Sequence, residues 1–264
     1  MRGIHQKIKV TIIGSGRVAT HLAHAFHDND VPVGEIFSRS LDRAKELSAH
    51  IPNSSATDSL DFAQSESKIF LLAIKDDAIS RAVNKIKLPP GSTLFHTSGT
   101  VSMNVMANNI EYFGVFYPLQ TFASNRDIDF KRIPILIEAN HPSALNQARE
   151  LAKLVSQTVQ EVKEAERQQL HVAAVFASNF TNRMLAAAKE ILAETSLHKK
   201  ILQPLVEQSI ANVFEVGADQ ALTGPARRND QTTIAKHLKL LESQPELADI
   251  YQRITHMIIT KYRE

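Results

Sequence analysis

The most constraining feature of this sequence is a glycine-rich turn between a strand-like segment and a helix-like segment. Residues 9–13 are apolar and β-branched, and residues 17–28 place their apolar side chains on one helical face. The turn between them reads Gly-Ser-Gly-Arg-Val-Ala, a G-x-G-x-x-A pattern. This order favours a dinucleotide-binding unit, in which N–H groups at the helix start hold a pyrophosphate; the alternative is a turn without a ligand. The residues expected to contact the dinucleotide are Gly14, Ser15, Gly16, Arg17 and Val18.

The end of the second predicted strand indicates which dinucleotide binds. The strand over residues 34–38 is followed by Arg39 and Ser40, without the Asp or Glu that bonds a ribose 2′-hydroxyl in NAD-binding folds. Arg39 can pair with a 2′-phosphate, and Ser38 and Ser40 can donate hydrogen bonds to it. The sequence therefore predicts NADP(H) as the cofactor. The alternative is that Arg39 is a solvated surface side chain.

The first half of the chain alternates apolar runs with amphipathic segments. This pattern predicts an α/β fold of the Rossmann type, with a mainly parallel sheet. The expected helices cover residues 41–50, 76–86 and 142–155, and the further strands cover 68–74, 93–95, 114–116, 133–137 and 160–162. The run at 68–74 is the most continuous and suits a central strand buried on both faces.

Polar and small residues follow the predicted strands at 68–74 and 93–95, where ligands of such sheets bind. We expect at least one of Asp76 and Asp77 to cap the next helix. Plain turns are the alternative to a cofactor-lining role. The residues expected to line the cofactor are Ala73, Ile74, Lys75, Thr97, Ser98 and Gly99.

The character of the sequence changes near Glu164, and the rest of the chain is almost wholly helical. We therefore predict a cofactor-binding domain over residues 1–163 and an all-helical substrate and dimerisation domain over 164–264. Helices are expected at 164–194, 200–216, 232–242 and 245–261. The first is apolar on all sides near its middle and needs burial, so we expect it to lie partly in a homodimer interface.

Hydride transfer also needs a proton donor. On the predicted helix 164–194, the polar residues His171, Ser178 and Asn182 fall on one line, and Asn179 lies beside it. A polar stripe on an otherwise buried helix needs hydrogen-bond partners or a water-filled cleft; mutual hydrogen bonds or a dimer contact would also satisfy it. His96 is a competing donor because its reference pKa is near neutrality, unless it only bonds the backbone.

Several segments together resemble the Rossmann-like proteins that carry a C-terminal domain of unknown function, DUF2520. They are the glycine turn, Ser-Arg-Ser at 38–40, His-Thr-Ser-Gly at 96–99, Tyr-Pro-Leu-Gln-Thr-Phe at 117–122 and Thr-Gly-Pro-Ala-Arg-Arg-Asn-Asp at 223–230. The resemblance covers nearly the whole chain. It implies an NADP oxidoreductase related to pyrroline-5-carboxylate reductase, ketopantoate reductase and the β-hydroxyacid dehydrogenases. It also implies a C-terminal domain of the 6-phosphogluconate dehydrogenase C-terminal-like type, with a family boundary that can begin near residue 125.

The resemblance also bears on the substrate site. Tyr117 stands where the family often has His, and Asn229 stands where it often has Gly; Asn tolerates a left-handed backbone better than most residues. The relatives carry a catalytic Lys and an Asn on the corresponding helix. This Lys has no counterpart between residues 164 and 189, so the resemblance implies His171 as the acid and Asn179 as the residue that orients the substrate. We expect Tyr117 to bind substrate. Arg228 would bind a substrate carboxylate with Asp230 orienting it, unless these two form a structural pair.

Composition excludes several other classes of site and partner. The chain has no cysteine, which excludes disulfides and thiolate sites, and its histidines are scattered, so we predict no metal. Its net charge of +2 and the absence of a long apolar run favour neither nucleic acid nor membrane as a partner. The polar N-terminus leads us to expect no signal peptide and a cytoplasmic protein.

These observations predict an NADP(H)-dependent oxidoreductase that transfers a hydride to or from a small carbonyl or imine substrate, which can carry a carboxylate. Two alternatives share the same fold. One is a non-catalytic NADP-binding sensor or structural protein. The other is an F420-dependent NADP oxidoreductase.

Overall fold

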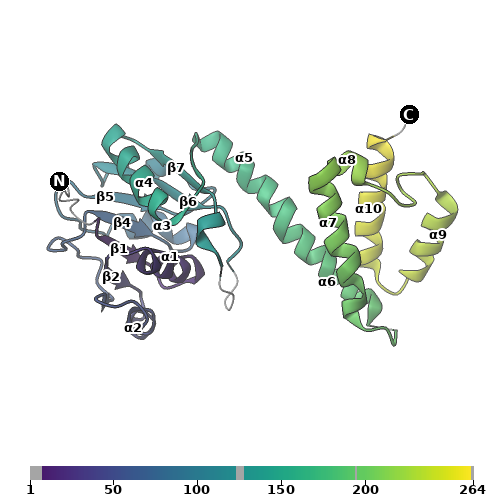
Figure 1. Ribbon diagram of the computed structural model, residues 1–264, viewed down its shortest axis with the longest axis horizontal. Helices are drawn as coiled ribbons and strands as arrows, with labels where there is room; N and C mark the ends of the chain where they lie inside the picture. Colours follow the sequence, from purple (N-terminus) through teal and green to yellow (C-terminus); the bar gives the residue numbers. More distant parts are fainter. Residues whose placement is uncertain (1–7, 123–127, 194, 263–264) are drawn as a thin grey trace. The chain divides into compact units, whose positions relative to one another are not determined.

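The computed structural model describes residues 8–122, 128–193 and 195–262. These residues form two compact units, Met1–Asn179 and Phe180–Glu264, and Figure 1 shows a sheet flanked by helices in the first unit and helices alone in the second. The predicted α/β fold with a helical C-terminal region is confirmed. The composition changes at Glu164, whereas the compact units divide after Asn179.

The N-terminal unit is built on an eight-stranded sheet with the order β3-β2-β1-β4-β5-β6-β7-β8. All neighbouring strands are parallel except β6 and β7. The sheet is therefore mainly parallel, as predicted. The strands are β1 (Val10–Ile13), β2 (Val33–Phe37), β3 (Ser55–Thr57), β4 (Ile69–Leu72), β5 (Thr93–His96), β6 (Tyr112–Pro118), β7 (Ile135–Ala139) and β8 (Val159–Glu161).

Helices cover both faces of this sheet. Strand β4 shows why: Ile69 and Leu71 join one apolar cluster, and Phe70 and Leu72 join the other. The first cluster includes side chains of α1, α2 and α4, and the second includes those of α3. The central strand is thus buried on both sides, as predicted. The helices are α1 (Arg17–Asp28), α2 (Leu41–Ala49), α3 (Asp76–Val83) and α4 (Pro142–Val155), with 3₁₀ turns at Met103–Met106 and Phe130–Arg132.

The helix predicted over residues 164–194 is interrupted. It consists of α5 (Glu164–Ala174), a π-helical turn (Val175–Phe180) and α6 (Thr181–Leu192). Only Arg167 is buried in α5, and the side chains of Val172 and Phe176 are 56% and 62% exposed. Within a single chain this helix therefore lacks the burial on most sides that its composition led us to expect.

The C-terminal unit consists of helices. Besides α6, it contains a 3₁₀ turn (Lys199–Leu202), α7 (Gln203–Val216), α8 (Ala218–Ala221), α9 (Gln231–Leu240) and α10 (Pro245–Lys261). Its buried core cluster contains only Ala187, Leu241 and Leu247. Among the described residues, no helix has the length and apolar character needed to cross a membrane.

Candidate active site

The glycine turn joins β1 to α1 at the carboxyl edge of the sheet. Gly14 has φ +141°, and a Cβ placed on it would lie 2.1 Å from the carbonyl oxygen of Ala73. Its N–H donates to the Phe37 carbonyl at 2.9 Å. The chain must therefore pass between the ends of β2 and β4, which only glycine permits.

Gly16 lies in open space, in contrast to Gly14. It is exposed, and a Cβ added there would meet no atom within 4 Å. Gly16 is the N-cap of α1, and no side chain caps this helix or places an acid in its first turn. The first N–H groups of α1 therefore point at open space with a favourable dipole, which suits a phosphate. Arg17 is exposed beside them and Val18 is half-buried.

The end of β2 is fastened to this turn. The Ser15 hydroxyl donates to the Ser38 hydroxyl at 2.8 Å, and the Ser40 N–H donates to the same oxygen at 3.3 Å. Ser38 is buried, while Arg39 and Ser40 are exposed. Within the described part of the chain, Arg39 has no hydrogen-bond or ion-pair partner. Its guanidinium is thus available beside the turn, as an NADP-binding site requires.

A cavity of about 410 Å³ lies between α1 and α2 and reaches the glycine turn. Arg43 lines it, and the sequence analysis did not single out this residue. The signal was present, because Arg43 follows Arg39 by four residues at the start of α2. The lining residues are Ser15, Thr20, His24, Arg43, Glu46, Leu47 and His50.

The loops after β4 and β5 are tied to each other beside the turn. The Ala73 N–H donates to the Ile13 carbonyl at 2.9 Å, so the end of β4 lies next to β1, and Ile74 packs near Gly14. The hydroxyls of Ser98 and Thr100 both donate to one oxygen of Asp76, at 2.8 and 2.9 Å. The predicted capping role of Asp76 and Asp77 is wrong: Lys75 is the N-cap of α3 and no side chain caps it.

His96 is completely buried at the end of β5. Its Nδ1 accepts a hydrogen bond from the Ser98 N–H at 3.2 Å, and its Nε2 has no partner in the described structure. Burial, helped by the nearby charge of Arg167, lowers the pKa of His96 to about 4. The imidazole is therefore neutral at pH 7 and shapes the loop, a setting that does not support a proton-donor role.

The predicted residues Tyr117 and His171 meet at this edge of the sheet. The Tyr117 hydroxyl lies 3.0 Å from His171 Nδ1, although Tyr117 belongs to β6 and His171 to α5. Both are half-buried. A Cβ on Gly99 would lie 2.4 Å from His171 Nδ1 and 3.0 Å from Tyr117 Cζ. The loop after β5 thus needs glycine here to let this pair approach.

The surroundings of the pair shift the pKa of Tyr117 in opposite directions. Burial raises the pKa of the Tyr117 phenol, and the Arg167 guanidinium partly offsets this while the Asp76 carboxylate adds to it. Two turns further along the helix, the Ser178 hydroxyl lies 2.8 Å from that of Thr121. The polar line predicted on this helix therefore contacts the segment at the end of β6 at two points.

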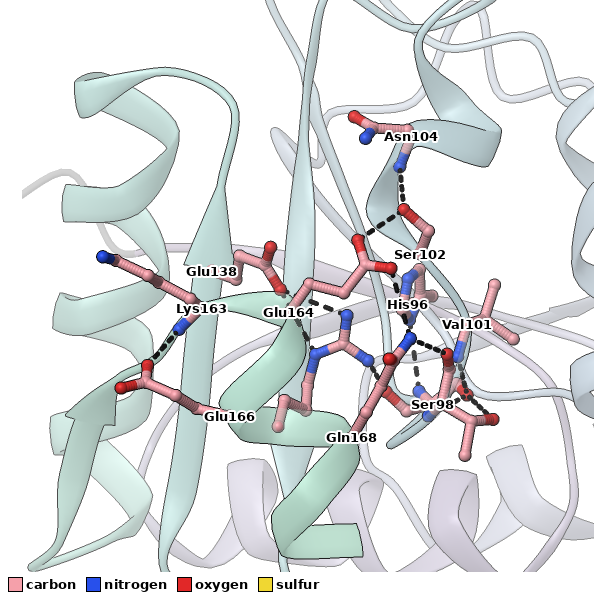
Figure 2. Close-up of polar contacts among 12 residues, drawn as sticks. His96, Ser98, Val101, Ser102, Asn104, Glu138, Lys163, Glu164, Glu166 and Gln168 are labelled. Atoms are coloured by element: carbon pink, nitrogen blue, oxygen red, sulfur yellow. Dashed lines mark hydrogen bonds and ion pairs between the residues drawn. The ribbon is translucent and has the colours of Figure 1, made fainter.

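A buried ion pair that sequence analysis missed lies beneath these residues. Arg167 donates from Nε and Nη2 to Glu138 Oε2, at 3.2 and 3.1 Å, and from Nη1 to the Ser98 carbonyl at 3.2 Å. Burial raises the pKa of Glu138 and Arg167 lowers it. Figure 2 shows Glu138, Ser98 and Glu164 within one polar network. Arg167 lies four residues before His171, so its place on the same helical face was a usable signal.

Family models match both parts of the chain: a Rossmann-like domain over residues 3–117 and DUF2520, a domain of unknown function, over residues 133–258. A solved structure from Bacteroides fragilis, provisionally named an NADP oxidoreductase, is 31% identical. It covers 97% of this chain and 99% of its own, with a TM-score of 0.87. The chain belongs to the DUF2520 family of Rossmann-like proteins. The predicted resemblance is confirmed.

More distant solved structures share the fold of this DUF2520 protein. A pyrroline-5-carboxylate reductase from Coxiella burnetii is 16% identical, covers 97% of this chain and 98% of its own, and has a TM-score of 0.60. A reductive aminase from Aspergillus terreus, solved with NADPH and ethyl-5-oxohexanoate, is 12% identical, covers 97% and 95%, and has a TM-score of 0.72. At these identities only the fold is established. A comparison with curated proteins gives no match.

Three further predicted residues have local surroundings that the structure describes. Asn179 is exposed in the π turn, and its side chain makes no hydrogen bond within the described residues. Asn229 has φ +52°, the left-handed backbone expected there. Asp230 accepts from the N–H and hydroxyl of Thr233, at 3.0 and 2.7 Å, and thereby caps α9. Its carboxylate is committed to that cap, and the described structure contains no ion pair between it and the exposed Arg228.

A metal centre finds no support in the part of the chain that the structure describes. No group of three or more His, Asp or Glu side chains gathers there as a ligand set. The polar groups at the sheet edge are hydroxyls, a phenol and an imidazole, which suit proton transfer and hydrogen bonding.

Proposed function

We propose that this DUF2520 protein is an NADP(H)-dependent oxidoreductase that transfers a hydride to or from a small carbonyl or imine substrate. The observation that carries the proposal is that an open phosphate cradle and a Tyr117–His171 pair lie at one carboxyl edge of the sheet. The name of the Bacteroides relative and the NADPH in the Aspergillus reductive aminase support it.

The residues at this edge fit the cofactor. The α1 N-terminus at Gly16 would hold the pyrophosphate, because the space in front of it is open and its N–H groups are free of a cap. Arg39, Ser40 and Arg43 would hold the 2′-phosphate, since the guanidinium groups match its charge. The segments 73–75 and 97–99 would line the rest. When bound, NADP(H) supplies or accepts the hydride.

The Tyr117–His171 pair would move the proton. In the direction of reduction, a proton passes from the Tyr117 hydroxyl to the substrate oxygen or nitrogen. The Nδ1–H of His171 then returns a proton to the phenolate while its Nε2 takes a proton from solvent, so that the imidazole stays neutral. His171 is half-exposed and can be reprotonated by solvent. Arg167 favours this transfer because its charge lowers the pKa of Tyr117.

The test combines binding and turnover. NADPH and NADH affinities are measured by fluorescence titration, and NADPH oxidation is then followed with F420 and with a panel of ketones, aldehydes and cyclic imines. Y117F and H171Q should lower kcat on the order of 100-fold, with NADPH affinity unchanged, because general acid catalysis contributes about that much. Failure to bind either dinucleotide rejects the proposal. Tight NADPH binding without turnover of any carbonyl, imine or F420 substrate identifies a non-catalytic NADP-binding protein.

We also propose that the protein forms a homodimer through its C-terminal unit. Large apolar side chains of this unit are exposed, among them Leu205, Phe214 and Leu240. Large exposed apolar side chains mark interaction sites, and a second copy supplies the same side chains. Sedimentation equilibrium of the purified protein should give twice the chain mass of 29.3 kDa; a monomer at micromolar concentration rejects the dimer.

A further inference from the structure

Arg167 occupies an unusual position for a charged residue. Among the described residues, it is the only Lys, Arg, Asp or Glu in the buried class, and its exposed fraction is 0%. Burying a charge is costly unless the charge is paired and all its donors are satisfied. Arg167 lies near the start of α5, four residues before His171. Its role should therefore lie in what its hydrogen bonds hold together.

The guanidinium joins three separate parts of the chain. It binds Glu138 of β7 through two N–H groups and the Ser98 carbonyl of the loop after β5 through a third, while its own backbone belongs to α5. The acceptor carbonyl of Ser98 immediately precedes Gly99. Gly99 is the residue against which His171 and Tyr117 pack. A planar and rigid fork therefore fixes the spacing between this loop and the helix that carries His171.

Two neighbouring hydrogen bonds also hold α5 against the loop after β5, but they are weaker. Glu164 accepts from the Ser102 hydroxyl at 2.6 Å, and Gln168 donates to the Thr100 carbonyl at 3.0 Å. Both use flexible side chains, and Gln168 is exposed, so each holds the geometry less firmly than the buried guanidinium, which donates twice to Glu138 Oε2 and once to Ser98. Figure 2 shows Glu164, Ser102 and Gln168 around the same loop.

We infer that Arg167 is a positioning residue that keeps the Tyr117–His171 pair in register with the loop at residues 97–99. It acts by holding the Ser98 carbonyl and the Glu138 carboxylate at once. Its catalytic consequence rests on the function proposed above. The groups that face Tyr117 with a charge are Arg167 and Asp76, and they act on its pKa in opposite directions.

The test separates positioning from mere stability by using a charge-free replacement. R167M alone leaves the half-buried Glu138 without its partner, which destabilises the fold. The double variant R167M/E138L removes both charges, and apolar replacement of a buried pair usually preserves the fold. R167K keeps the charge but cannot reach both acceptors with a fork. R149M is the matched control, because it removes the surface ion pair between Arg149 and Glu161.

The expected readouts are kinetic and spectroscopic. In folded R167M/E138L, kcat should fall on the order of 100-fold, because small misplacements of a reacting group cost that much, while the Kd for NADPH changes by no more than about threefold. The Tyr117 pKa should rise in this variant and stay near the wild-type value in R167K. Tyrosinate absorbance reports it cleanly because the chain has four Tyr and no Trp, and Y117F identifies the signal. R149M should match the wild type throughout.

One spectroscopic outcome is independent of turnover. The Nδ1 chemical shift of His171, measured by nitrogen NMR, should differ between proteins with Tyr117 and the same proteins carrying Y117F. This difference should vanish in R167M/E138L and persist in R149M. If R167M/E138L retains wild-type kcat and wild-type Tyr117 and His171 titrations, the inference is overturned and Arg167 is only structural. If the wild type turns over no substrate, the proposed function fails, and the NMR and absorbance titrations still decide whether Arg167 positions the pair.

Discussion

The two compact units differ in how completely a single chain buries their apolar side chains. In the N-terminal unit, every residue of β4 is buried and the sheet has a packed cluster on each face. In the C-terminal unit, no residue of α7 is buried, and the side chains of Phe214, Leu240 and Leu205 are 86%, 78% and 67% exposed. The first unit buries most of its apolar side chains within one copy, whereas the second leaves several of them exposed.

The difference follows from the architecture of each unit. The crossovers of a parallel sheet bring helices of the same chain onto both of its faces. A helix with an apolar stripe needs another surface to cover it, and the C-terminal unit offers only a small cluster around Ala187, Leu241 and Leu247. Stability in the first unit should therefore depend on internal packing and strain, and in the second on association.

The largest effect is expected from charges placed on exposed apolar side chains of the C-terminal unit. L205D/F214D should weaken the dimer on the order of 1,000-fold, about 4 kcal/mol, because charges would be buried against apolar neighbours. The matched control is L154D, since Leu154 is also exposed but belongs to α4. Sedimentation velocity over a dilution series measures the effect. If L205D/F214D and L154D weaken the dimer equally, the expected difference between the two units is wrong.

A smaller effect should separate the two glycines of the N-terminal turn. G14A combines a positive φ with a Cβ 2.1 Å from a backbone oxygen, so we expect a loss of about 3 kcal/mol in unfolding free energy. G16A has φ −85° and open space around it, so its stability should match the wild type. Its NADPH affinity should nevertheless fall about tenfold, because the added methyl group occupies the space of the phosphate.

Denaturant unfolding and NADPH titration of both variants test this contrast. A G14A variant as stable as G16A would show that the turn is not held between β2 and β4. A G16A variant with wild-type NADPH affinity would count against the cradle at the start of α1.

Burial of His96 predicts a pH dependence that belongs to the N-terminal unit. Its pKa is about 4 in the folded protein, below the ordinary value of 6.5. Between these values the unfolded chain binds more protons, so stability falls as the pH is lowered from about 6.5 to 4. The upper limit of this contribution is about 3 kcal/mol, and we expect about 2. Urea unfolding at pH 7 and pH 4.5 should show this loss in the wild type and a smaller one in H96N, whereas an identical loss in both would refute it.

The comparison of units also explains what the sequence could predict. Periodicity located β4 and the glycine turn because their burial is set locally, by continuous apolar residues and by glycine spacing. It missed β3, which has three residues that are not buried, and the π turn at Val175–Phe180, which composition does not mark. Exposure of the C-terminal helices depends on tertiary packing, which no local pattern contains.

The candidate site was predictable only in part, for a similar reason. His171 stood out as a polar residue on an apolar helix, and Tyr117 entered through the family resemblance. Arg167 was missed because its burial depends on Glu138, 29 residues away, and on Ser98, 69 residues away. The complete burial of His96, which lowers its pKa, was invisible in the sequence.

The smallest effect should fall on the rim of the N-terminal unit, where neither packing nor association is involved. Arg39 is exposed and has no partner within the described residues, so R39A should leave the unfolding free energy unchanged. It should weaken NADPH binding by about 10- to 100-fold, the worth of one or two hydrogen bonds to a charged group, and leave NADH binding unchanged because NADH lacks the 2′-phosphate. R81A, which removes an exposed arginine of α3, is the control. If R39A loses equal affinity for NADPH and NADH, Arg39 contacts the part that both dinucleotides share. If it loses affinity for neither, Arg39 is a solvated side chain. Both results argue against the proposal that Arg39 selects NADP(H).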